Sequence, residues 1–209
     1  MKFKTAIFGL VAALCVTLGG CKWGNDDDKK PAPPAATGYE VSVYQDGKLS
    51  QKVQADQYST DGDALSYHLK SRDSAGKDSG QASGTWVVKH NSWKPVPSDK
   101  RYTATLYSGK TAVGSWGVHT FTTDARSALL FPADGSEVLR ACGNLVVQET
   151  KAGAAGKAVA RVTVYDGDQK VYTVELSSYQ VIGQHVEGTP ADGSGYTLIW
   201  GNYKVEELK

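Results

Sequence analysis

Apolar and polar residues alternate in short stretches from residue 39 to the end of the chain. Tyr39 to Tyr44 alternates, Asp46-Gly47 has the composition of a tight turn, and Lys48 to Val53 runs back. An Asp-Gly pair between two alternating stretches is a strong local signal for antiparallel pairing, because it accommodates the twist of a two-residue turn. We therefore predict a β-hairpin over residues 39–53.

The next alternating stretch, residues 65–69, is expected to place Leu65, Tyr67 and Leu69 on one face and His68 on the other. Helical periodicity is scarce, and only residues 124–130 and 136–142 could form a helical turn or two. Further strands are expected at Thr85–Lys89, Tyr102–Tyr107, Trp116–Thr122, Leu145–Glu149, Ala158–Tyr165, Val171–Leu176, Gln180–His185 and Tyr196–Val205.

This succession of short strands and glycine-rich turns, with no alternation of strands and helices, predicts an all-β fold. An antiparallel β-sandwich or a barrel fits the pattern. Residues 65–123 favour the sandwich, because Tyr102-Thr103-Ala104-Thr105-Leu106 leads through a glycine turn to a strand ending Phe121-Thr122-Thr123. This segment resembles the immunoglobulin-like domains of bacterial envelope proteins.

The resemblance implies two modules, residues 39–124 and 125–209, because Phe131 to Ser136 resembles the opening of a following domain of that kind. The two segments could also form one sandwich. A competing similarity is present: Val41 to Tyr44, with Val53 and Tyr58, recurs at the same spacing as Val162 to Tyr165, with Val174 and Tyr179. Since a duplication with that offset conflicts with a boundary near residue 124, we interpret it as two hairpins with similar cross-strand requirements.

The N-terminus has the features of a secretory signal. Lys2 and Lys4 precede an apolar run from Ala6 to Leu18, and Leu18-Gly19-Gly20-Cys21 follows. The run is too short to span a bilayer, which needs about 20 apolar residues. The ending resembles the lipid-attachment sequence of bacterial lipoproteins; the alternative is an ordinary secretory signal with Cys21 as a chance thiol.

The lipoprotein resemblance implies that residues 1–20 are cleaved and that Cys21 carries covalent lipid, including a palmitate-type acyl chain. Several acyl chains together anchor a protein essentially permanently. Lys22 stands where an Asp would favour the inner membrane in such families, so the resemblance implies an outer-membrane protein facing the periplasm or the cell surface. Residues 21–38 combine charges with prolines and alanines, which predicts a disordered tether.

Charge and cysteine content narrow the classes of partner. After cleavage, 21 basic and 22 acidic residues remain, a net charge of −1, which argues against a nucleic-acid partner or a polybasic membrane patch. If Cys15 is removed and Cys21 acylated, Cys142 has no partner for an intramolecular disulfide. We expect Cys142 to be a small buried apolar residue.

No group of residues has the spacing of a known catalytic or metal site. His68, His90, His119 and His185 are far apart in sequence and are expected at the surface or at strand edges. Ser79, on a glycine turn, lacks the following helix of a nucleophile elbow. The carboxylate pairs in Asp61-Gly62-Asp63 and Asp166-Gly167-Asp168 lack the further ligands of a calcium loop. We therefore predict no catalytic residue, no metal and no cofactor other than the lipid.

The remaining candidate for binding is Trp93, which lies in a predicted loop and could contribute to a patch for a glycan or a protein. The sequence thus predicts an anchored envelope protein with a binding, assembly or scaffolding role and no enzymatic activity. One alternative is a periplasmic enzyme inhibitor or immunity lipoprotein that projects residues 71–84 or 184–195. A second is a glycan or peptidoglycan hydrolase, which would need His119 or His185 beside carboxylates.

Overall fold

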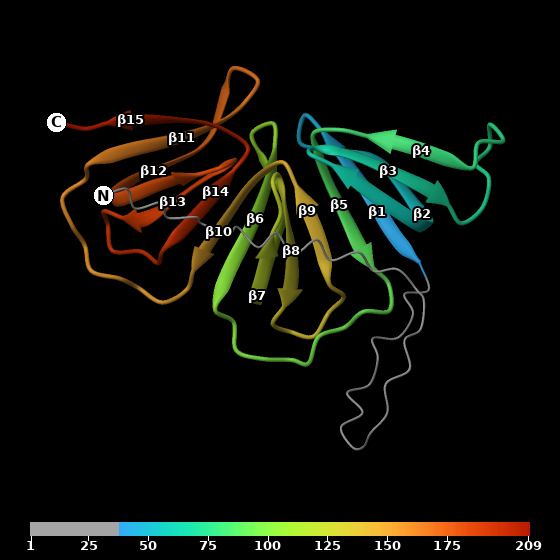
Figure 1. The fold of residues 1–209 in the computed structure, drawn as a ribbon, viewed down its shortest axis with the longest axis horizontal. Coiled ribbons are helices and arrows are strands. Elements are labelled where there is room, and N and C mark those ends of the chain that lie inside the picture. The colour runs from blue at the N-terminus through green and yellow to red at the C-terminus, as the bar shows by residue number, and fades with distance from the viewer. Residues whose placement is uncertain (1–37) are drawn as a thin grey trace, which may run out of the picture. The chain divides into compact units, whose positions relative to one another are not determined.

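The computed structural model describes residues 38–209, so the predicted signal peptide, Cys21 and nearly all of the predicted tether lie outside the described residues. The described chain is all-β, and its strands form one antiparallel sheet of 15 strands (Figure 1). The strands are β1 (Tyr39–Gln45), β2 (Lys48–Asp61), β3 (Ala64–Leu69), β4 (Ser79–Ala82), β5 (Thr85–His90), β6 (Tyr102–Ser108), β7 (Thr111–Thr123), β8 (Ser127–Pro132), β9 (Leu139–Cys142), β10 (Asn144–Glu149), β11 (Ala160–Asp166), β12 (Gln169–Ile182), β13 (His185–Pro190), β14 (Thr197–Trp200) and β15 (Asn202–Glu207). The prediction of an all-β, antiparallel, sandwich-like fold is confirmed.

Three consecutive five-stranded repeats make up the sheet. Repeat 1 is β1–β5, repeat 2 is β6–β10 and repeat 3 is β11–β15, and each has the spatial order fifth, first, second, third, fourth strand. The fourth strand of a repeat also pairs with the fifth strand of the repeat before it, as β9 does with β5 and β14 with β10. Two identical junctions therefore join three similar units.

The expected boundary near residue 124 falls within repeat 2. Residue 124 lies in the turn between β7 and β8, which pair with each other, and the sheet has no break there. The described residues lie within a single compact unit and form one continuous sheet, whose organising unit is the repeat.

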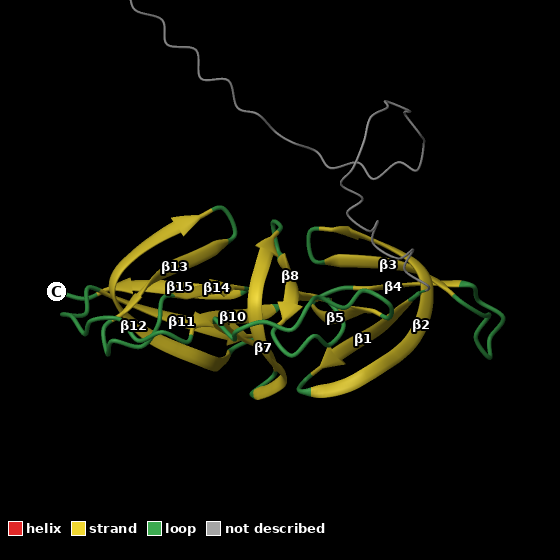
Figure 2. Ribbon diagram, turned by 90° about the horizontal axis from the view of Figure 1, so that it is seen from below, coloured by secondary structure: helices red, strands yellow, loops and turns green. Residues whose placement is uncertain are grey.

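The second strand of each repeat is unusually long, with 14, 13 and 14 residues in β2, β7 and β12. Its first half pairs with the first strand and its second half with the third, and a bulge separates the halves. The bulge inserts one residue, so inward side chains change from a spacing of two to a spacing of three, and the strand curves (Figure 2). The inward positions are Val53, Ala55 and Tyr58 in β2, Trp116, Val118 and Phe121 in β7, and Val174, Leu176 and Tyr179 in β12.

This spacing corrects our interpretation of the internal similarity. The two similar hairpins, at residues 41–58 and 162–179, are the first halves of repeats 1 and 3, and they are equivalent in strand length, pairing and bulge position. The equivalent hairpin of repeat 2 is not recognisable by sequence similarity, because Trp116 and Phe121 replace Val53 and Tyr58. These positions stay apolar, but the residue types differ.

Each repeat encloses its own apolar core, and β5 and β10 serve as walls between cores. Trp86 and Val88 point into the core of repeat 1, whereas Val87, between them, is buried in the core of repeat 2. In β10, Leu145 and Val147 are buried in the core of repeat 2, whereas Val146, between them, is buried in the core of repeat 3. Full burial of such a side chain stabilises a fold by about 1.5–3 kcal/mol, so each wall strand contributes to two units at once.

The two outer edges of the array carry polar residues at the equivalent positions. Lys204 of β15 is exposed where Val87 and Val146 are buried, and β4 presents the exposed residues Ser79 and Gln81. Charged side chains and short strands on a sheet edge discourage pairing with other chains. Repeats 1 and 3 therefore have the character of end caps.

Several local predictions can be compared with the strands. The hairpin over residues 39–53 is confirmed, and Leu65, Tyr67 and Leu69 are buried while His68 is exposed. The helical turns allowed at residues 124–130 and 136–142 are wrong, because β8 and β9 occupy most of these ranges and pair with each other. Turns at Gly183 and Gly201 divide two of the predicted strands, 180–185 and 196–205.

The turns between the first and second strands of the repeats contact one another in a row. The amide of Gly47 donates to Ser108 Oγ at 3.1 Å, and the amide of Gly109 donates to the carboxylate of Asp166. Gly109 has φ of +56°, and a Cβ placed on it would lie 3.0 Å from the carbonyl carbon of Asp46. Only glycine gives this turn both its left-handed conformation and its close approach to repeat 1.

We predict that Gly109→Ala destabilises the protein more than Gly167→Ala does. The two glycines occupy equivalent turns with φ of +56° and +58°, but Gly167 has no neighbour within 4 Å of an added Cβ. Gly167→Ala should cost about 1 kcal/mol from backbone strain alone, and Gly109→Ala about 1–2 kcal/mol more because the turns must separate. Urea denaturation followed by tryptophan fluorescence measures the difference. Equal losses in the two variants would mean that the contact between the turns contributes nothing.

Candidate functional site

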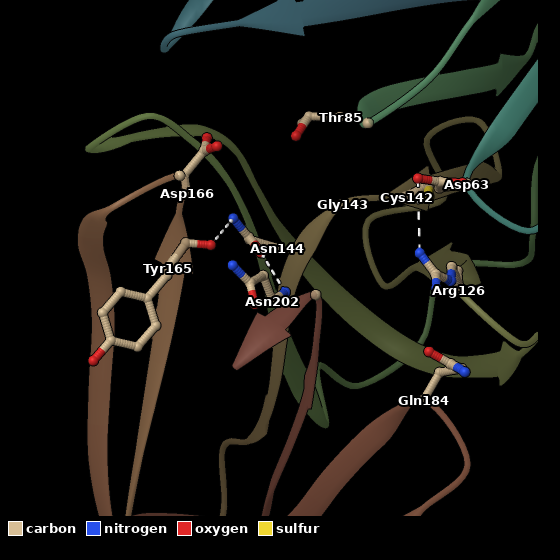
Figure 3. Close-up of a pocket in the computed structure, with 13 residues that line it drawn as sticks. Asp63, Thr85, Arg126, Cys142, Gly143, Asn144, Tyr165, Asp166, Gln184 and Asn202 are labelled. Carbon is tan, nitrogen blue, oxygen red and sulfur yellow. Dashed lines mark hydrogen bonds and ion pairs between the residues drawn. The ribbon is translucent and has the colours of Figure 1, made fainter. Parts of the chain in front are cut away.

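A polar groove of about 380 Å³ lies where turns from all three repeats meet (Figure 3). Each repeat supplies the turn between its fourth and fifth strands, and each also supplies one residue from the turn between its second and third strands. The turns between the fourth and fifth strands contribute Gly84 and Thr85, Gly143 and Asn144, and Gly201 and Asn202. The turns between the second and third strands contribute Asp63, Arg126 and Gln184. The remaining lining residues are Cys142, Tyr165, Asp166 and Gly167.

Glycine geometry explains why these turns can approach so closely. Gly143 and Gly201 have φ of +128° and +112°, and each precedes the fifth strand of its repeat. A Cβ on Gly143 would lie 2.8 Å from Thr85 Oγ1, and one on Gly201 would lie 2.2 Å from Asn144 Oδ1. The first residue of one fifth strand thus packs against the glycine of the next repeat, at both junctions.

Asn144 fixes the geometry of the second junction. It is buried, its side-chain Nδ2 donates to the carbonyl oxygen of Tyr165 at 3.0 Å, and its Oδ1 accepts from the amide of Asn202 at 3.1 Å. A buried side-chain amide with both ends bonded holds the segments it bonds in a single arrangement. The groove is therefore held in shape by the chain itself.

The indole of Trp86 positions the opposite rim. Its Nε1 donates to the backbone carbonyl of Asp63 at 2.9 Å, while its ring fills the core of repeat 1. Asp63 Oδ2 in turn lies 3.7 Å from Arg126 Nη1, and both side chains are about half exposed. An exposed pair of this kind contributes little to stability, so its effect is to balance charge at the rim.

The thiol of Cys142 borders the groove and is buried. Its residue is 1% exposed, and burial raises the pKa of the thiol to about 12. A thiol with such a pKa is protonated at neutral pH, and the thiolate is the nucleophilic form. The prediction that Cys142 is a free, buried, apolar-like residue is confirmed.

Three polar side chains of the groove have no partner among residues 38–209. They are the hydroxyl of Thr85 and the amides of Gln184 and Asn202. Thr85 is the most informative, because the residue is only 9% exposed and its hydroxyl is directed into the groove (Figure 3). Among residues 38–209, the fully buried side-chain atoms without a hydrogen-bond partner are Arg140 Nε and Trp200 Nε1, so the Thr85 hydroxyl is open to solvent. A ligand with a complementary group would replace water at this hydroxyl.

The candidate residues named from the sequence lie elsewhere or outside the described chain. Trp93 is half-buried in the β5–β6 loop, with edge-to-face contacts to His90 and Phe131 at 5.4 and 5.5 Å, and it does not line the groove. Its role in a binding patch stays a prediction. Cys21 is outside the described residues. His119 Nδ1 lies 2.9 Å from the carbonyl of Asp99, and His185 stacks on Trp200.

His90 differs from the expectation of a surface histidine. It is 7% exposed, its Nε2 lies 3.1 Å from the hydroxyl of Tyr58, and its ring also contacts Tyr39 and Trp93. Burial, with a smaller contribution from Arg140, lowers the pKa of His90 to about 4. The sequence could not reveal this, because the enclosing residues come from β1, β2, β9 and the β5–β6 loop.

The two acidic pairs considered for calcium each send one carboxylate to the groove, Asp63 and Asp166. In the described part of the chain, no group of three or more His, Cys, Asp or Glu side chains could hold a metal ion. Residues 38–209 also include no helix with the length and apolar character needed to cross a bilayer.

Comparison with known proteins found no matching family model, no matching curated protein and no matching solved structure.

The groove could not be predicted from the sequence, because its lining residues are spread over more than 130 positions, from Asp63 to Asn202. A signal was nevertheless present: a glycine precedes a Thr or Asn at the start of the last strand of each repeat, in Gly84-Thr85, Gly143-Asn144 and Gly201-Asn202. Its meaning becomes evident only once the three repeats are aligned.

We predict an acid-dependent loss of stability that depends on His90. The pKa of this histidine is lower in the folded state than the 6.5 of an unfolded chain, so its contribution is fully present above about pH 6.5 and is lost as the pH falls toward 4. The loss should reach about 2–3 kcal/mol at pH 4.

The free energy of unfolding of wild type, His90→Phe and Thr122→Val, measured by urea denaturation between pH 4 and 7.5, tests this prediction. His90→Phe should remove that part of the pH dependence, whereas Thr122→Val, which changes no titratable group at an exposed position, should keep the wild-type slope. A wild-type slope in His90→Phe would contradict the assignment.

Proposed function

We propose that this chain is a lipid-anchored envelope protein with a non-enzymatic binding role, and that its ligand is held in the groove between the repeats. The observation that carries the proposal is the set of unpartnered polar groups, Thr85, Gln184 and Asn202, which three separate repeats bring to one preformed cavity. Cavities of this size that are fixed by the fold and lined by a few convergent polar groups are the usual form of a binding site.

The N-terminal sequence supports the anchored part of the proposal. Leu18 to Cys21 resembles a lipid-attachment site, and the Pro- and Ala-containing segment that follows would hold the repeats away from the lipid surface at roughly 3 Å per extended residue. By the same resemblance we place the protein at the outer membrane. A tethered binding domain raises the local concentration of its ligand near that surface.

A second candidate function, an inhibitor or immunity lipoprotein, is favoured by the loop between β3 and β4. Its residues 70–78 are all exposed, yet Asp73 Oδ1 accepts from the amides of Ala75 and Lys77 at 2.9 and 2.8 Å. An exposed loop with its own hydrogen bonds loses little conformational entropy when it enters a cleft of another protein. Half of the other expected loop, residues 184–195, is the strand β13.

Photo-crosslinking in intact bacterial cells separates these two functions. A photoreactive amino acid is placed at Gln184 in the groove, at Lys77 in the loop, or at the exposed Lys157 as a control. We expect an adduct from Gln184 alone, detected as a mass change of the purified chain. An adduct from Lys77 alone would favour the inhibitor, and equal labelling at all three positions would contradict a specific site.

Lipid attachment is tested by growth with an alkyne-bearing palmitate analogue. We predict that wild type and Cys142→Ala are labelled and sediment with membranes, whereas Cys21→Ser loses more than about nine tenths of the label and is released. Cys142→Ala is the matched control, because it removes the other cysteine of the predicted mature chain. Labelling that persists in Cys21→Ser would contradict the proposal that the protein is anchored through lipid on Cys21.

A further inference from the structure

The chemistry of the groove restricts what it can bind. Its side chains are mostly amides and hydroxyls, which both donate and accept hydrogen bonds, and glycines leave the neighbouring backbone open to close approach. The ring of Tyr165 points away from the cavity (Figure 3), and Cys142 is buried behind it. A ligand with a large apolar surface would therefore find little to pack against.

Charge narrows the class further. Asp63 and Asp166 face the groove with Arg126 as the one cationic side chain in its lining, and Arg126 is already paired with Asp63. An anionic ligand would meet an excess carboxylate at Asp166. The Asp166 carboxylate accepts one hydrogen bond from the amide of Gly109. Its other lone pairs can accept hydrogen bonds from a neutral donor.

The fixed spacing of the groups favours a ligand with many short polar groups on a compact frame. Thr85, Gln184 and Asn202 come from three different turns around a cavity of about 380 Å³, at the lower end of small-ligand sites. Adjacent hydroxyls on a sugar ring are donors and acceptors at close, rigid spacing, and they match such a set at little entropic cost.

We propose that the groove binds a neutral saccharide of one or two rings, with Thr85 and Asn202 bonding to ring hydroxyls and Asp166 accepting from a third. This inference rests on the proposed binding role of the groove. It adds the ligand class, which neither the anchor sequence nor the fold specifies.

Titration of the ¹⁵N-labelled full chain in detergent micelles tests the proposal by NMR. The probes are glucose, N-acetylglucosamine and their β-1,4-linked dimers, with glycylglycine and inorganic phosphate as comparison ligands. At least one saccharide should cause saturable shifts in the amide signals of Gly84, Gly143 and Gly201. The variants are Thr85→Val, Asn202→Ala and, as a matched control at an exposed position of β7, Thr122→Val.

We expect Thr85→Val and Asn202→Ala each to weaken saccharide binding about fivefold or more, the factor for one lost neutral hydrogen bond, and Thr122→Val to leave it unchanged. Asn202 is exposed, so its variant answers the question even if Thr85→Val unfolds. No shift with any saccharide, or equal affinity in all variants, would overturn the proposal. Binding of phosphate or glycylglycine alone would overturn the saccharide but keep the groove as a binding site, whereas a missing adduct at Gln184 in cells would remove the proposed function itself.

Discussion

The structure depends on two strands that are buried on both faces. β5 and β10 each complete one repeat through their pairing with that repeat's first strand, and each accepts the fourth strand of the next repeat on its other side. An antiparallel strand in a small protein usually has one face in water, and its side chains alternate accordingly. Here Trp86, Val87 and Val88 are consecutive and all buried, because a different core lies on each face.

Whether a strand is buried on one face or on both explains which strands could be predicted from the sequence. A strand with one buried face, such as β3, alternates, and its inward residues Leu65, Tyr67 and Leu69 were predicted correctly. β8 and β9 were harder, because tertiary pairing determines their conformation and short apolar runs such as Ala128 to Leu130 have no clear period. The bulged strands hid the repeat, since a change of spacing from two to three breaks any search for strict alternation.

The groove was beyond the sequence for a related reason. Its residues occupy turns and the ends of strands, and turn residues such as Asp63 and Gly201 have an adequate local explanation in turn formation alone. Their shared position arises from the junctions between repeats, which bring together turns separated by about 60 positions in the chain. The burial of Cys142 could be predicted because a small apolar residue between Ala141 and Gly143 is usually buried in any fold.

The polar ends of the array also bear on how such a chain could change in length. Since β9 meets β5 in the same way as β14 meets β10, an additional middle repeat placed between repeats 2 and 3 would find a matching strand on either side. The terminal strands β4 and β15, with Gln81 and Lys204, would keep facing solvent. Insertion of whole repeats would then add further turns next to those that line the groove, while the polar ends of the array stayed the same. The number of binding grooves could therefore change in evolution without a change in how each repeat folds.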